Sequence, residues 1–413
     1  MIDIDEFRAE AQEFLDDRTR PIDRSVGAWG DGPNTIGAYQ VKTPEQDRAE
    51  LEAARAWQRQ KFDGGFGWIA GPPRYGGRGL PPRYERVFQQ LEADYVVAPQ
   101  TMLGGSLGIV APTILAHGPD WMRDAYLKAM HRGDILGCQL FSEPEAGSDL
   151  AAVRTRAQLD GSEWRIDGQK VWSSKAKHAE VGLLLARSDP DAAKHHGLTA
   201  FLLPMSSDGV DVRPLRQMTG GADFNEVFLS DVRLPDRFRI GEPNEGWGVV
   251  RTALGNERAA IGAGGAGYGG AGLAGLVPPD RIVQMARHFG VEGDPICRQD
   301  LARLYSGYEI ARYTSLRTAA VVESGGELGP WTSTSKLHLS NHLNWAAGFV
   351  ARILGPRLGA DTGEWGTYAW KQLLLGVVGM RIGGGTDEIL RNTIAEKVLG
   401  LPREPRTEER STT

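Results

Sequence analysis

The chain has 413 residues, which is long enough for two or three domains with well-filled cores and therefore long enough for an enzyme. Its apolar content of 41% and charged content of 24% are those of an ordinary globular protein. Because the net charge is −6, nucleic acid is not an expected partner.

The two cysteines, Cys138 and Cys297, are too few and too far apart for a disulfide framework. They fit a reducing compartment, so we expect a cytoplasmic protein. The acidic, amphipathic N-terminus does not resemble a signal peptide, and no apolar run approaches the roughly 20 residues that span a bilayer. We therefore expect no membrane association.

Residues 1–135 carry apolar side chains at the spacing of helices. Phe7 and Ala11 stand four apart, and the stretches 84–93 and 121–130 follow the same period. We expect an N-terminal helical domain over 1–135.

From residue 136 the apolar period changes from helical to alternating. Short segments such as EWRIDGQKVW, VGLLLAR and LTAFLLP are separated by Asp-Gly, Asp-Pro and Ser-Asp-Gly turn signals. The pattern predicts a small antiparallel β domain over 136–244.

The helical period returns over 245–402, with breaks at the glycine-rich segment 262–275 and at Gly383–Gly385. The last residues, 403–413, form a polar tail. Helices, then strands, then helices, without βαβ alternation, indicate a multidomain α+β protein and exclude a doubly wound parallel sheet.

Two patterns imitate known sites. Residues 262–267 match G-x-G-x-x-G, but a helical segment precedes them, whereas a dinucleotide site needs a strand there. His338 and His342 are spaced like half a zinc site, but no third ligand is evident, so no metal is expected.

The stretch GGGTDEILRN, residues 383–392, leads from bare backbone into a helix with Thr386 as its cap. Free N–H groups at such a start can hold a phosphate or the polar edge of a cofactor. An ordinary loop-to-helix junction has the same composition, so both interpretations remain open on these residues alone.

Three ordered segments resemble the acyl-CoA dehydrogenase family: LFSEPEAGSDLAAVRTRAQLDGSEWRIDGQKVWSS at 140–174, EVFLSDVRLP at 226–235 and GGTDEILRNTIAEKVLGLP at 384–402. The resemblance covers essentially the whole chain. It implies a middle antiparallel β-barrel domain, a C-terminal four-helix-bundle-like domain, FAD as cofactor and dehydrogenation of an acyl-CoA thioester.

The resemblance also assigns residues to the flavin, which needs an aromatic wall and polar groups at its rim. Trp172 would lie on the face, although an ordinary core position is the alternative. The other implied contacts to FAD are Gln139, Leu140, Phe141, Ser142, Ser174, Thr386 and Glu388. Ser148 matches a family position near the pantetheine and pyrophosphate of the acyl-CoA.

The usual catalytic base of the family is absent. Many members have a glutamate immediately before the Gly-Thr of the last segment, where this chain has Gly384. Isovaleryl-type members instead carry the base on a helix, one residue before an arginine, which matches Glu257 and Arg258. Glu257 is thus the expected base and Arg258 the group that orients it or the CoA chain; the alternative is a pair on a solvated helix face. The backbone N–H of Gly384 remains available to the substrate carbonyl.

Arg287 and Gln299 are the possible counterparts of a family segment that reaches the FAD phosphates across a subunit interface, although their spacing departs from the family pattern. The resemblance therefore implies a homodimer or homotetramer, or a hetero-oligomer.

Electrons would pass to an electron-transfer flavoprotein. The alternatives are a flavin oxidase or monooxygenase on the same fold, and a non-catalytic or half-site subunit of a hetero-oligomer. Because Gly384 leaves room near the reacting carbons, branched, cyclic or sterol-derived acyl chains are compatible with the site.

Overall fold

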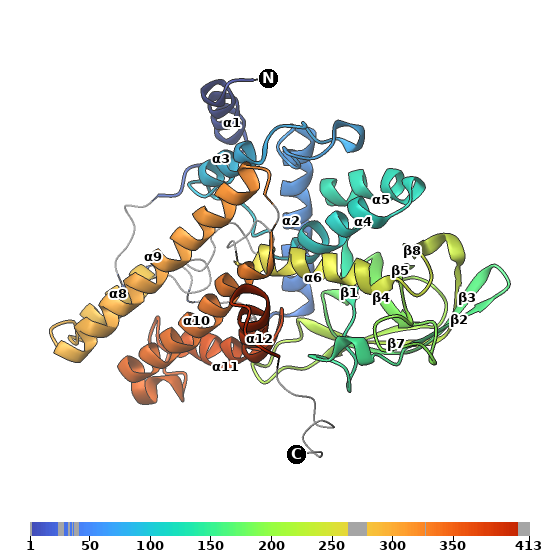
Figure 1. Ribbon diagram of the computed structural model, residues 1–413. Coiled ribbons are helices and arrows are strands. Elements are labelled where there is room, and N and C mark those ends of the chain that lie inside the picture. Colours follow the sequence, from blue (N-terminus) through green and yellow to red (C-terminus); the bar gives the residue numbers. More distant parts are fainter. Residues whose placement is uncertain are drawn as a thin grey trace, which may run out of the picture.

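The computed structural model describes residues 2–23, 29–31, 34, 36, 41–262, 279–326 and 328–403; the side chains of 259–262 are not described. Figure 1 shows helices at both ends of the chain and strands in the middle. This order confirms the α+β layout that the changes of apolar period predict. The division into domains at 135/136, 244/245 and 402/403 stays a prediction. Most of the glycine-rich segment 262–275 and of the polar tail lies outside the described residues.

A cluster of aromatic side chains joins the first three helices of the N-terminal part. The helices of this part are α1 Ile4–Arg18, α2 Pro44–Asp63, α3 Pro82–Glu92, α4 Ala111–His117 and α5 Asp120–Arg132. Phe14 packs against Trp57 and Phe66, with ring centroids 6.1 and 4.6 Å apart. Helix α2 begins with a capping box between Thr43 and Gln46, which satisfies backbone N–H groups that a helix start leaves without partners.

The middle of the chain forms one sheet of eight strands. Its strands are β1 Gly137–Leu140, β2 Arg156–Asp160, β3 Glu163–Ser174, β4 Val181–Arg187, β5 Leu198–Pro204, β6 Val210–Leu215, β7 Phe224–Pro235 and β8 Arg239–Ile240. The order is β6-β7-β3-β2-β4-β5-β8, and β1 pairs with β4.

The sheet departs from the expected closed antiparallel barrel in two respects. Within the described residues, no pairing joins β6 to β8, so the sheet does not close. Strands β1 and β2 both run parallel to β4. Strand β1 follows α5 and pairs directly with β4, although β2 and β3 come between these two strands in the sequence.

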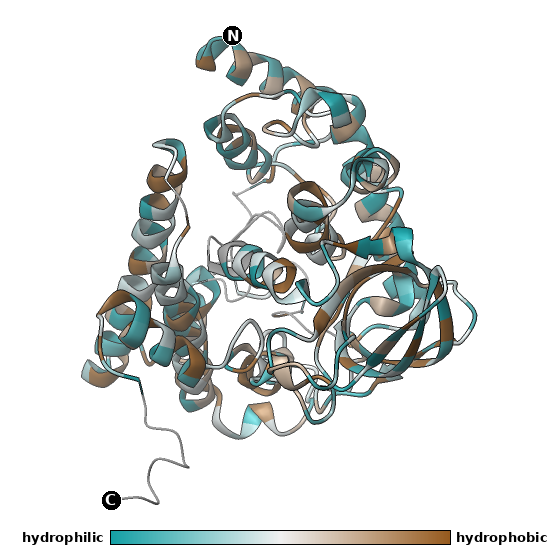
Figure 2. Ribbon diagram, turned by 45° about the vertical axis from the view of Figure 1, so that its right-hand side comes forward, coloured by the Kyte–Doolittle hydropathy of each residue, from teal (hydrophilic) through white to brown (hydrophobic). Residues whose placement is uncertain are grey.

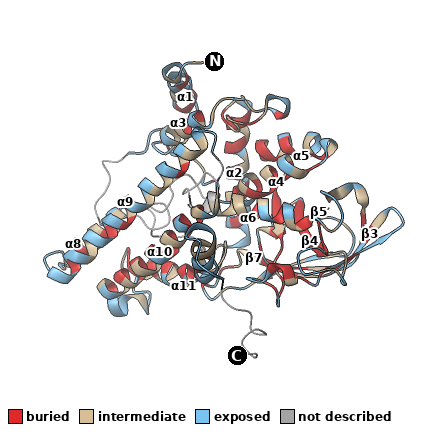
Figure 3. Cartoon of the chain, in the orientation of Figure 1, coloured by how far each residue is buried: buried red, intermediate tan, exposed pale blue. Residues whose placement is uncertain are grey.

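Strands β4 and β5 are buried on both faces, which explains their unbroken apolar sequences. The side chains on one face of these two strands belong to a hydrophobic cluster that contains Leu140, Trp164 and Phe201. Their other face packs against α6, Gly246–Gly262, through Val250 and Ala253. Figure 3 shows this buried core, and Figure 2 shows the hydrophobic stretches on the strands.

Helix α6 lies between the sheet and the remaining helices (Figure 1). These are α8 Pro279–His288, α9 Pro295–Glu323, α10 Ser333–Leu354, α11 Lys371–Met380 and α12 Asp387–Thr393. Helix α10 contacts α6, α9, α11 and α12, so it is the central element of the C-terminal part. None of the helices in the described ranges is both long and apolar enough to cross a membrane.

Candidate functional site

Glu257 on α6 faces the sheet at β1. The side-chain amide of Gln139 donates to its Oε2 at 3.3 Å. Burial raises the pKa of the Glu257 carboxyl, and the hydrogen bond from Gln139 and the charges of Arg258 and Lys336 oppose this rise only in part. Glu257 is therefore not a residue of a solvated helix face. It is a partly buried carboxylate that holds a proton more readily than an ordinary glutamate.

Arg258 is also partly buried. Burial lowers the pKa of its guanidinium, and the charge of Glu257 opposes that change. No hydrogen bond or ion pair joins its side chain to another of the described residues. Among the described residues, the guanidinium of Arg258 is therefore available to an anionic or polar group of a substrate.

Two other carboxylates near the predicted site, Glu143 and Asp387, have the opposite character to Glu257. Burial alone would raise the pKa of each, but hydrogen bonds and neighbouring cations outweigh it and hold both below the usual range. The pKa of Glu85 is raised by burial, but Glu85 lies on α3 and accepts the backbone N–H of Ala70 at 3.0 Å. Glu257 is thus the candidate at this site whose environment favours proton abstraction.

A buried lysine fixes the segment after β1. Lys170 is completely buried; its Nζ donates to Glu143 Oε1 at 2.8 Å and to the carbonyl of Phe141 at 3.1 Å. Burial lowers the pKa of Lys170 to about 8, against the opposing effect of Glu143. Glu143 also accepts the backbone N–H groups of Arg154 and Thr155 at 2.6 and 2.8 Å. Residues 141–143 are therefore held firmly against β3.

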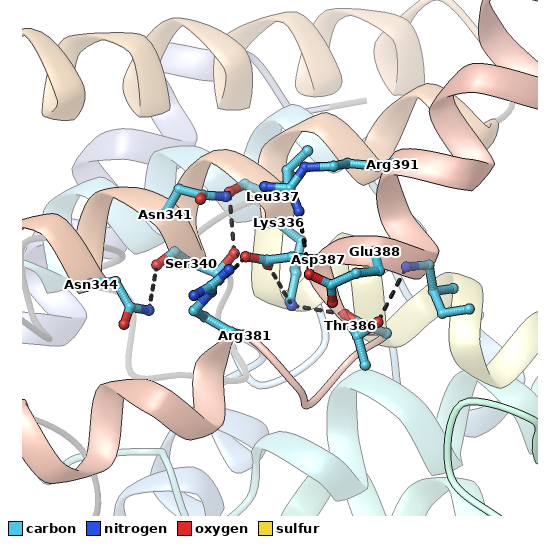
Figure 4. Close-up of polar contacts among 12 residues, drawn as sticks. Lys336, Leu337, Ser340, Asn341, Asn344, Arg381, Thr386, Asp387, Glu388 and Arg391 are labelled. Carbon is cyan, nitrogen blue, oxygen red and sulfur yellow. Dashed lines mark hydrogen bonds and ion pairs between the residues drawn. The ribbon is translucent and has the colours of Figure 1, made fainter.

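A second buried lysine holds the glycine-rich loop, as Figure 4 shows. Lys336 on α10 is 1% exposed, and its Nζ donates to the carbonyl of Gly385 at 2.8 Å. Its Nζ also lies 3.8 Å from Asp387 Oδ1. Asp387 in turn accepts from Ser340 Oγ at 2.6 Å and from Arg381 Nε at 2.8 Å.

Asp387 lies in the first turn of α12, but its carboxylate does not face solvent. Its side chain is completely buried and faces α10. Sequence reasoning missed both lysines because a lysine is ordinarily a surface residue, and the partners of Lys336 lie on distant segments. The alternation of inward and outward residues along β3 places Lys170 on the inward face, and this was the signal in the sequence that could have predicted its burial.

The loop itself has two successive glycines in the left-handed region, with φ of 69° at Gly384 and 93° at Gly385. On either side, the N–H of Gly383 donates to Gly379 O and that of Asp387 to Arg381 O, each at 3.0 Å. No described residue accepts a hydrogen bond from the N–H of Gly384 or Gly385. The loop thus presents two unused donors from a fixed backbone.

Thr386 caps α12: its Oγ1 accepts the N–H of Ile389 at 3.2 Å. Glu388 is exposed and lies 3.5 Å from Arg391 on the same helix. The stretch GGGTDEILRN thus forms a capped loop-to-helix junction, in which Glu388 is exposed and Thr386 is partly buried.

Trp172 is not a core residue. Its side chain is 57% exposed, although it lies within β3, and its φ is 60°. The pairing between β3 and β7 is irregular from Lys170 to Ser173, which turns this residue outward. Ser174, two residues further along β3, is exposed as well. An outward tryptophan in a sparsely populated backbone conformation is typical of a binding surface.

The remaining predicted residues divide into two groups. Leu140 and Phe141 are buried, so a ligand would meet mainly their backbone, whereas Ser142 is partly exposed and Ser148 fully exposed. Arg287 and Gln299 are exposed at the junction of α8 and α9. Figure 1 places that junction at the far end of the helices from α6 and β1, so the chain does not bring this pair to the Gln139–Glu257 contact.

Comparisons with known proteins identify the class of this fold and site. The family model of the acyl-CoA dehydrogenase middle domain matches residues 138–232, and that of the C-terminal domain matches 244–399. The acyl-CoA dehydrogenase IpdE1 of Mycobacterium tuberculosis is 33% identical over 98% of this chain and 99% of its own length. FadE34 of the same organism is 36% identical over 86% of this chain. The match covers 48% of FadE34, so this chain spans about half of that protein's length.

Solved structures agree with these matches. The Tcur3481-Tcur3483 steroid ACAD has a TM-score of 0.73 and 26% identity, over 97% of this chain and 98% of that chain. The ChsE4-ChsE5 complex from Mycobacterium tuberculosis has a TM-score of 0.71 and 26% identity, over the same shares. The chain belongs to the acyl-CoA dehydrogenase family, as the three sequence segments indicate, and is an oxidoreductase of that class.

The left-handed backbone of the glycine loop gives a stability prediction. Replacing Gly384 by Ala should lower the free energy of unfolding by about 1–2 kcal/mol, because a Cβ disfavours this region. Gly383→Ala is the matched control, since Gly383 lacks a positive φ and an added Cβ would meet only Gly379 O at 3.7 Å. Denaturant titration measures both; equal losses in the two variants would contradict the assigned loop conformation.

Proposed function

We propose that this chain is an FAD-dependent acyl-CoA dehydrogenase in which Glu257 removes the α-proton of the thioester. The observation that carries the proposal is the partly buried carboxylate of Glu257, which has a raised pKa and is held by Gln139 beside the sheet. Gly384, at the family's usual base position, has no side chain to compete for this role.

The chain's own residues fit a flavin. Trp172 offers an exposed aromatic face, Ser142 and Ser174 offer hydroxyl groups near it, and the loop offers the open N–H groups of Gly384 and Gly385. Thr386 and Glu388 would contact the cofactor from the same loop. Bound FAD would supply the acceptor for the β-hydride at its N5 position.

Proton removal needs help because the α-proton of a thioester is weakly acidic. We infer that the N–H of Gly384 donates to the thioester oxygen and so stabilises the enolate charge that develops there. Glu257 accepts the α-proton on its carboxylate. An acyl chain that covers Glu257 would exclude water and strengthen its basicity further. Arg258 would orient the CoA portion, and Ser148 would meet the pantetheine and pyrophosphate from the exposed segment after β1.

The acyl group that fits best is bulky. A glycine at 384 leaves space where other members have a carboxylate. A structural neighbour at 26% identity is named as a steroid ACAD, which supports cyclic or sterol-derived acyl-CoA substrates for this chain. Electrons would leave through an electron-transfer flavoprotein.

A hetero-oligomer is a second candidate for the assembly. Two structural neighbours at 26% identity are named as pairs of chains, Tcur3481-Tcur3483 and ChsE4-ChsE5. Arg287 and Gln299 are exposed and distant from Glu257, which suits contacts to a cofactor held mainly by another subunit. We therefore propose an oligomer in which this pair reaches the FAD phosphates across an interface, with a homodimer or homotetramer as the simpler form.

The proposed base is tested by Glu257→Gln, which keeps the shape and removes the proton acceptor. FAD content should be unchanged, and anaerobic flavin reduction by a good acyl-CoA should slow by about 10²–10⁴-fold. In the unmodified protein the reduction rate should rise with pH through a value above that of an ordinary glutamate, because the base acts only when deprotonated.

The matched control is Glu242→Gln, on an exposed glutamate just before α6. It should reduce its flavin at the normal rate. If Glu257→Gln also reduces at that rate, another group carries the proton and the proposed mechanism fails.

The proposed flavin wall is tested by Trp172→Ala. Loss of the ring should weaken FAD binding about 2- to 12-fold, the equivalent of one aromatic contact. Trp172→Phe should retain most of the affinity, and Leu159→Ala, which removes an exposed apolar side chain from β2, should not change it. Titration of the apoprotein with FAD gives the three dissociation constants. A normal constant for the alanine variant would remove Trp172 from the site.

The assembly is tested by producing the chain alone and measuring mass and FAD content together. A homo-oligomer should bind one FAD per chain. A chain that takes up FAD at about half that ratio, or only when made together with a related chain, would establish the hetero-oligomer. In the homo-oligomer, Arg287→Ala should lower FAD occupancy without changing the binding of acyl-CoA.

A further inference from the structure

The buried ammonium of Lys336 connects the two parts of the proposed site. We propose that Lys336 is a positioning residue, which holds the Gly384–Gly385 backbone in place and supplies the positive charge that keeps Glu257 available as a carboxylate. This proposal rests on the proposed function of Glu257, and it concerns a buried residue whose Nζ bonds within the protein.

The position of Lys336 supports the first role. Its helix, α10, packs against α6, which carries Glu257, and against α12, which follows the loop. Its Nζ bonds directly to the carbonyl of Gly385 at 2.8 Å, one residue from the N–H of Gly384. Since Asp387 N is bonded to Arg381 O, the loop is fixed at Gly385 by a side chain and at its base by the backbone. Figure 4 shows Lys336 reaching toward the loop from α10.

The cost of burial is the second argument. A lysine that is 1% exposed loses nearly all its hydration, and an apolar side chain of similar size would avoid that penalty. The ammonium regains part of the loss from Gly385 O and from Asp387 at 3.8 Å. Asp387 also accepts hydrogen bonds from Ser340 and Arg381, so Lys336 is not its sole partner.

The charges around Lys336 support the second role. Burial lowers the pKa of the Lys336 ammonium, and the charges of Asp387, Glu257 and Glu388 oppose that change only in part. Glu257 in turn faces Gln139 on β1, Arg258 on its own helix and Lys336. Because α10 packs against α6, the charge of Lys336 opposes the effect of burial on the pKa of Glu257.

Lys336→Met tests both roles in the purified protein, with and without added FAD. Hydrogen–deuterium exchange at Asp387, Ile389 and Leu390, whose N–H groups are bonded in the structure, should become at least about tenfold faster as the loop loosens. The pKa of Glu257, followed by infrared spectroscopy as the signal lost in Glu257→Gln, should rise by about 0.5–1 unit. The control Lys128→Met, on the exposed side of α5, should change neither.

Lys336→Met leaves Asp387 with less compensation and could fail to fold, so a second variant is needed. Lys336→Met/Asp387→Asn removes both charges and keeps a side chain that bonds to Ser340. Replacement of a buried ion pair as a whole is often neutral for stability. The double variant should therefore fold, and it should still show faster loop exchange and a raised Glu257 pKa.

Wild-type exchange or a wild-type Glu257 pKa in the folded variant would overturn the proposal. These readouts do not depend on turnover. If Glu257→Gln is fully active but Lys336→Met alters both readouts, the base assignment fails and the positioning role stands. If Glu257→Gln is inactive but Lys336→Met changes neither the loop exchange nor the pKa of Glu257, the base assignment stands and the positioning role fails.

Discussion

A lysine ammonium buried away from water must be surrounded by acceptors, and this constraint fixes both loops of the proposed site. Lys170 brings together Glu143 and the carbonyl of Phe141, which locks the segment after β1 against β3. Lys336 brings together Asp387 and the carbonyl of Gly385, which locks the glycine loop against α10. In each case one cation joins an acid and a backbone carbonyl that the sequence places far from it. Each lysine side chain is thereby held in one conformation and supports the loop that it contacts.

The two networks also separate the roles of the carboxylates. Glu143 and Asp387 are saturated with donors, so each stays ionised and structural. Within the described residues, Glu257 receives one long hydrogen bond of 3.3 Å, and burial outweighs the charges of Arg258 and Lys336. Acids of the same type thus acquire different chemistry from their surroundings, which is how a single chain can hold a framework charge and a reactive group close together.

The sequence predicts the parts of this arrangement that depend on local periodicity and on ordered segments. The helical ends, the strands and the family follow from apolar spacing and from the segments 140–174, 226–235 and 384–402. Sheet closure, the inward face of Asp387 and the clamp by Lys336 depend on contacts between distant residues, which spacing does not encode. The outward turn of Trp172 depends on an irregularity in strand pairing, which alternation alone would place elsewhere.

The left-handed glycines have a consequence for how the site can change by mutation. A mutation that placed a glutamate at position 384 would meet the backbone penalty before it could contribute a carboxylate. The side chain and the loop would have to change together, whereas single substitutions arise one at a time. Under the proposed mechanism, the backbone of Gly384 therefore favours a base on α6, because any side chain at position 384 would carry this penalty.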